Sequence, residues 1–173
     1  MENERIFKKH YDRKDLAGEH RFGDSGQIAF FLIFLAFWGL DSFYIRYSTQ
    51  FSEYAPLYIR IPIAIVILTI TGILARQGLT IVFAEVREEP DIIRKGVFSV
   101  VRHPVYLSAI LFYLSLLAVS FSILAALIWV TIILFYIYLC KHEEELFIEK
   151  YGSDYKQYKK ETPMLLPTIR RKK

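Results

Sequence analysis

The amino-acid sequence predicts an all-α integral membrane protein, a bundle of about four transmembrane helices whose last two form a tight helical hairpin. Three observations predict this class. Hydrophobic residues make up 54% of the 173-residue chain, yet they gather in long runs separated by dense charged segments. One of these runs is long enough for two helices, and the basic residues are concentrated in three segments between and beside the runs. Such segregation is typical of membrane proteins.

The first two apolar runs predict one helical hairpin. Residues 27–47 would form a helix of about 30 Å, which matches the hydrocarbon thickness of a bilayer. Residues 57–75 are similar in length, and the linker 48–56 between the two runs is short. We therefore expect an antiparallel pair. The polar residues 1–25 before it suit a short interfacial helix and a solvated tail equally well.

The third run predicts a second hairpin. Residues 104–140 carry no charged side chain, and 37 residues are too many for one span. The only polar break, at residues 120–122, falls near the middle. We expect two helices of about 16–18 residues, each about 25 Å long, joined by a tight turn. The polar segments 76–103 and 141–173 would then emerge side by side.

The distribution of charge predicts the topology. Residues 1–26, 76–103 and 141–173 contain 6, 5 and 9 of the 22 Lys and Arg residues, and the other two are Arg46 and Arg60. Four spans place all three basic segments on one side of the membrane. The positive-inside bias makes that side cytoplasmic, so we predict an N-terminus and a C-terminus in the cytoplasm.

The whole chain, 1–173, is predicted to be a single domain, because it is too short for two sizeable cores. It divides into a cytoplasmic segment 1–26, a first hairpin 27–75 and a region 76–173 that carries the unusual polar residues. The net charge of +4 does not indicate a nucleic-acid partner, since the basic residues flank the apolar runs. Membrane lipids are the expected partners, with the basic end 170–173 at anionic headgroups.

Two polar segments carry the candidate chemistry. Arg102 and His103 directly precede a proline that opens an apolar helix, a position where proline is well tolerated and where backbone N–H groups favour an anion. In the second segment, three successive glutamates lie directly beneath another apolar helix, which is costly if they are desolvated. Because the two helices form a hairpin, we predict that Arg102 and His103 meet Glu143 and Glu144. Residues 154–160 are predicted to form a short helix that closes over this site.

The combined pattern resembles a known family. Gly-x-Phe-x-x-x-Arg-His-Pro-x-Tyr at 96–106 is followed by the hairpin, then by two glutamates, a glycine, Tyr-x-x-Tyr ending at 158, and Pro163. This arrangement, over residues 76–167, resembles the isoprenylcysteine carboxyl methyltransferases and the related phospholipid methyltransferases. The resemblance implies a membrane-embedded methyltransferase with a cytoplasmic pocket for S-adenosyl-L-methionine. The implied acceptor is a lipophilic small molecule or lipid-linked group from the bilayer, and no metal is needed.

The resemblance also implies roles for individual residues. Carboxylates can accept hydrogen bonds from the cofactor's ribose or ammonium and favour its sulfonium charge. Arg102, His103 and Glu144 are the candidate catalytic residues. The residues implied to contact the cofactor are Ile92, Ile93, Phe98, His103, Pro104, Val105, Tyr106, Glu143 and Glu144.

Departures from the family pattern leave the acceptor open. Relatives that methylate prenylcysteine carboxylates carry Arg four residues before the paired glutamates, where this chain has Leu139. Phe98 stands where relatives usually have Tyr. The sequence also leaves two other functions open: an NADPH-dependent enzyme similar to membrane sterol reductases, which share an Arg-His-Pro-x-Tyr element, and a non-catalytic membrane binding module of the same fold.

Overall fold

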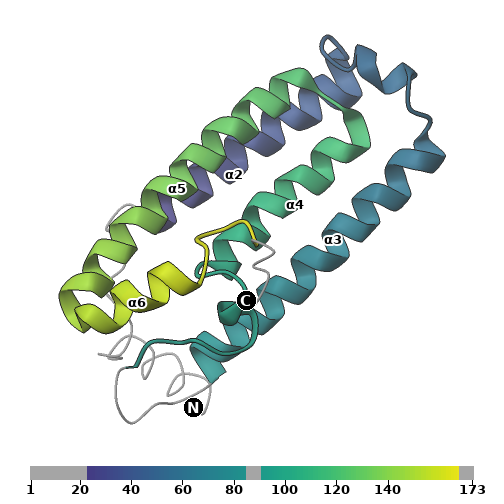
Figure 1. Cartoon of the computed structure of the whole chain (residues 1–173). Helices are drawn as coiled ribbons and strands as arrows, with labels where there is room; N and C mark the ends of the chain where they lie inside the picture. The colour runs from purple at the N-terminus through teal and green to yellow at the C-terminus, as the bar shows by residue number, and fades with distance from the viewer. Residues whose placement is uncertain (1–22, 85–90, 168–173) are drawn as a thin grey trace, which may run out of the picture.

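The computed structural model describes residues 23–84 and 91–167, and within these residues the elements are helical, with no β-strand. Figure 1 shows α2 beside α5 and α3 beside α4, with α6 folding back from the end of α5 toward the start of α4. This arrangement confirms the predicted all-α class. The α-helices are α2 (Gly23–Gly39), α3 (Leu57–Leu79), α4 (Pro104–Ser120), α5 (Ile123–Tyr151) and α6 (Ser153–Glu161).

Three helical segments of the described chain are long and apolar enough to cross a membrane: Gly23–Ile45, Leu57–Val82 and Ile123–Tyr151. The first two extend past α2 and α3 through short π-helices, Leu40–Ile45 and Thr80–Ala84. The second helix is longer than the predicted 57–75, because Arg76 and Gln77 are good helix formers and apolar residues resume at Leu79. α4 is a shorter apolar helix of 17 residues, as predicted.

The fourth helix is much longer than predicted. An end near Cys140 was expected, but α5 has 29 residues and continues to Tyr151. The residues after Cys140 are mostly good helix formers without Gly or Pro, so the change from apolar to charged composition does not end the helix. Gly152, with φ of +59°, ends it, and its N–H donates to the Ile148 carbonyl. The paired glutamates consequently lie on a rigid helix.

The turn between α4 and α5 is tied to the end of the first span. Asp41 is 2% exposed, and its carboxylate accepts hydrogen bonds from the Ser48 backbone N–H at 3.0 Å and from the Ser122 hydroxyl. The Ser122 hydroxyl also accepts from Ala125 N at 3.1 Å and so caps α5. Phe121 has φ of +53°, which reverses the chain direction. The predicted polar break at 120–122 is confirmed as the hairpin turn.

α3 and α4 pack closely near the start of α4. A Cβ atom at Gly78 would lie 2.9 Å from Val105 Cγ2, so only glycine allows this approach. Pro104 occupies the first turn of α4, as predicted, and His103 precedes it. This packing fixes the start of α4, where Arg102 and His103 lie. The predictions for residues 1–22 and 170–173 fall outside the described residues.

Candidate functional site

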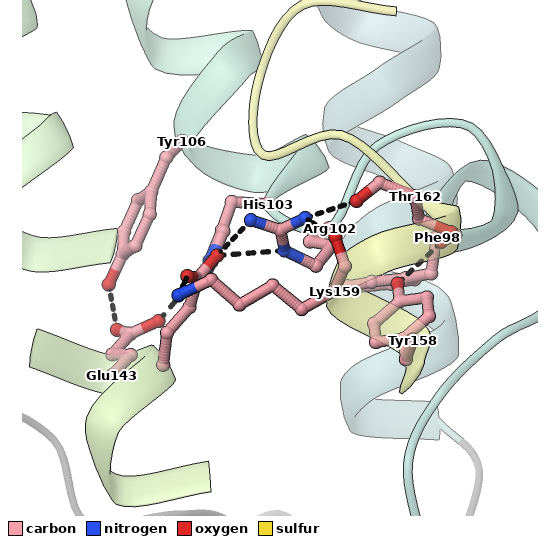
Figure 2. A network of polar contacts seen from close by, with 9 residues as sticks. Phe98, Arg102, His103, Tyr106, Glu143, Tyr158, Lys159 and Thr162 are labelled. Atoms are coloured by element: carbon pink, nitrogen blue, oxygen red, sulfur yellow. Dashed lines mark hydrogen bonds and ion pairs between the residues drawn. The ribbon is translucent and has the colours of Figure 1, made fainter. Parts of the chain in front are cut away.

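A buried ionic cluster forms where the start of α4, the lower part of α5 and α6 meet (Figure 2). Its centre is Glu144, whose side chain is 0% exposed. Arg102 Nε donates to Glu144 Oε1 at 2.7 Å, and Arg102 Nη2 lies 2.5 Å from the same oxygen. Lys159 Nζ, from α6, lies 2.7 Å from Glu144 Oε2. A buried carboxylate requires such pairing because it has lost its hydration.

His103 lies between the two glutamates. Its Nε2 is 3.4 Å from Glu144 Oε1 and its Nδ1 is 3.5 Å from Glu143 Oε2, which confirms the predicted meeting of the two segments. Burial disfavours the charged ring, but side-chain hydrogen bonds to Cys140, Glu143 and Glu144 outweigh it and raise the pKa of His103 well above 6.5. The two glutamates therefore favour the protonated form of the imidazole.

Glu143 is the more accessible of the two carboxylates. Its side chain is 22% exposed, and its Oε1 accepts a hydrogen bond from the Tyr106 hydroxyl. The Tyr106 ring also stacks on His103, with ring centroids 5.8 Å apart and an interplanar angle of 13°. Figure 2 shows Tyr106 and Glu143 on the side of the cluster away from Thr162. Of the two glutamates, only Glu143 thus keeps an exposed edge.

The Arg102 guanidinium makes its hydrogen bonds and its ion pair within the protein. Besides its two contacts to Glu144, its Nη1 donates to the carbonyl of Lys159 at 3.0 Å and to that of Thr162. Each of the three guanidinium nitrogens therefore has a protein partner, and the residue is 8% exposed. Arg102 holds α5 and α6 to the start of α4. Its predicted catalytic role remains a prediction, with no contact in the structure that supports direct action on a substrate.

The residues after α6, 162–165, form a C-terminal strap across the site. Arg102 N donates to the Pro163 carbonyl at 2.9 Å, and His103 N donates to the Met164 carbonyl at 3.1 Å. These two backbone N–H groups are thus occupied by the strap rather than available to an anion. The Tyr158 hydroxyl donates to the Phe98 carbonyl at 2.5 Å. Burial raises the pKa of Tyr158 to about 12, so this hydroxyl stays a neutral donor.

The other predicted cofactor contacts lie in the segment that leads into α4 and in its first turn. Phe98 and Pro104 are buried, the former in the 3-10 helix Gly96–Ser99. Val105 is half-buried and lies against Gly78 of α3. Ile92 and Ile93 are half-buried and precede the 3-10 helix. Their role in binding a cofactor remains a prediction.

The sequence interpretation missed two parts of this site. Lys159 was not selected, although it directly follows the second tyrosine of the Tyr-x-x-Tyr element. The strap was missed because its contacts use backbone carbonyls, which any residue provides. Leu139, where relatives have Arg, is 1% exposed and belongs to the hydrophobic core. A long cationic side chain would have to displace core residues there.

Comparison with known proteins gives one match. The family model described as phospholipid methyltransferase matches residues 56–154, which is more than half of the chain. The matched range contains Arg102, His103, Glu143 and Glu144 and ends before Lys159. No curated protein and no solved structure matches the chain.

Proposed function

Because the chain belongs to the phospholipid methyltransferase family, and is therefore a membrane methyltransferase, we propose that it transfers the methyl group of S-adenosyl-L-methionine to a lipophilic acceptor. The observation that carries this proposal is the pair of glutamates held at the start of α4 by Arg102 and His103. The pair joins the two halves of the sequence pattern on which the resemblance rests.

The chemistry of the site fits this cofactor. S-adenosyl-L-methionine carries two positive groups, a sulfonium and an ammonium, for which carboxylates are suitable partners. Glu143 has an exposed edge and is the direct contact in this proposal, together with Tyr106. Glu144 is fully buried and surrounded by cations, so we assign it a positioning role. The half-buried Ile92 and Ile93 and the ring of Phe98 would supply apolar contacts.

When bound, the cofactor supplies an electrophilic methyl group, and the protein's contribution is alignment, exclusion of water and placement of charge. His103 lies between two glutamates that favour its protonated form, which makes it a poor proton acceptor. An amine acceptor would have to arrive uncharged, whereas a carboxylate or thiolate needs no base.

The acceptor is proposed to enter laterally from the bilayer and to be uncharged rather than anionic. Leu139 lies in the core and offers no donor to a carboxylate, whose desolvation without a cationic partner is costly. With labelled S-adenosyl-L-methionine and reconstituted protein, we expect uncharged lipophilic amines to be methylated at least about tenfold faster than a prenylcysteine carboxylate, a factor that corresponds to about 1.4 kcal/mol. Preference for the carboxylate would contradict this assignment. If the protein binds the cofactor but transfers its methyl group to none of the acceptors, the result would favour a non-catalytic membrane binding module of the same fold.

The site is proposed to face the cytoplasm, because the basic segments flank it. Single cysteines test this orientation. Glu53 lies in the 3-10 helix Gln50–Glu53 near the opposite end and is exposed, as is Ser153 at the start of α6. The native Cys140 is buried and provides the unlabelled background. In intact cells, an impermeant thiol reagent should label the Glu53→Cys variant and spare Ser153→Cys until the cells are opened. The reverse pattern would overturn the orientation.

A further inference from the structure

Three basic side chains of the cluster share one buried carboxylate. Arg102, His103 and Lys159 all lie against Glu144, whereas Glu143 contacts His103 and the Tyr106 hydroxyl. A cation that shares its counter-charge and is open to solvent favours a ligand that brings an anionic group.

Only one of these three basic side chains is accessible to a ligand. Arg102 is 8% exposed, and each of its guanidinium nitrogens has a partner in the protein. His103 is 6% exposed, and its two ring nitrogens lie against the two glutamates. The Lys159 side chain, in contrast, is 44% exposed. Lys159 is therefore the cation that the cluster presents to solvent.

Lys159 also has hydrogen-bonding capacity left for a ligand. An ammonium group has three N–H donors, and within the described residues the contact given for Lys159 Nζ is the ion pair with Glu144 Oε2 at 2.7 Å. Figure 2 shows the side chain extending from α6 toward the part of the cluster where Glu143 lies. An accessible cation and an accessible carboxylate in one cluster match the two charged groups of an amino acid.

We propose that Lys159 binds the carboxylate of the methionine moiety of S-adenosyl-L-methionine, while Glu143 accepts from its ammonium. This inference rests on the proposed function, and it assigns a ligand contact beyond the range that the family model matches. It also differs from the expectation that the backbone N–H groups before α4 would favour an anion, because those of Arg102 and His103 donate to the strap.

Two ligands separate carboxylate binding from a structural role. S-adenosylhomocysteine keeps the amino-acid group, whereas methylthioadenosine lacks it. In the purified full-length chain, Lys159→Met should weaken S-adenosylhomocysteine about 10- to 100-fold, as expected for loss of a hydrogen bond to a charged group. The affinity for methylthioadenosine should stay within about twofold. Lys160→Met, which changes the neighbouring exposed lysine, should leave both affinities unchanged.

Several outcomes would overturn the inference. Unchanged binding of S-adenosylhomocysteine by Lys159→Met would do so, and so would equal losses for both ligands, since the lysine would then act through Glu144. Lys159→Arg keeps the charge and should retain most of the affinity, which covers the case in which the Met variant does not fold. If the unaltered protein binds neither ligand, the proposed function itself fails. That result differs from the two outcomes that would overturn only the role of Lys159.

Discussion

Replacing Glu144 with alanine is expected to lower the free energy of unfolding by about 3–5 kcal/mol, the cost of leaving a buried charge without its partner. The substitution would remove the common counter-charge of Arg102, His103 and Lys159. Arg102 and His103 are almost fully buried and cannot regain hydration without movement of α4 or α6. Thermal unfolding in detergent should therefore begin at a clearly lower temperature, and cofactor binding should be lost with it.

Glu145 provides the matched control for this effect. It is the next residue on the same helix, but it is exposed. Glu145→Ala should change the unfolding free energy by no more than about 0.5 kcal/mol, as is usual for surface positions. If Glu144→Ala and Glu145→Ala both unfold at the same temperature as the parent protein, the buried cluster does not hold α4, α5 and α6 together.

Glu143→Gln is expected to have the second large effect, on binding rather than stability. Glu143 is partly exposed and lies outside the contacts of Arg102, so the variant should melt close to the parent protein. Its affinity for S-adenosyl-L-methionine should fall by about 1.5–3 kcal/mol, or roughly 10- to 150-fold, because a charged acceptor becomes neutral. The loss should be similar for S-adenosylhomocysteine, which keeps the ammonium group, and smaller for methylthioadenosine, which lacks it. Equal affinity of Glu143→Gln and the parent protein would remove Glu143 from the site.

Most of the fold could be predicted because lipid-facing helices must be apolar over a fixed length. The many exposed apolar side chains of α3, Ile61, Ile63, Ile65 and Val66 among them, follow this rule. The turn at 120–122 was found because it is the only polar break in a long apolar run. The predicted end of α5 is wrong because it rests on the change from apolar to charged residues after Cys140. That change indicates where the helix leaves the apolar part of the membrane, whereas the helix itself ends at Gly152.

The candidate site was predictable only in part. A hairpin brings its two ends together, so the meeting of His103 with Glu143 and Glu144 followed from topology. The division of roles between the glutamates did not. Adjacent residues on a helix point about 100° apart, so one can be buried and the other open, but the sequence does not show which face of α5 turns inward. The position of Lys159 depends on the direction in which α6 folds back after Gly152. The pattern of apolar residues does not predict that direction.

The most direct test of this account is calorimetric titration of the purified protein in detergent with S-adenosyl-L-methionine and, separately, with NADPH. The two ligands distinguish a methyltransferase from a reductase that shares part of the sequence pattern. We predict a saturable binding heat for S-adenosyl-L-methionine that is reduced in Glu143→Gln, and no binding heat for NADPH. Binding of NADPH without binding of S-adenosyl-L-methionine would contradict the proposed function.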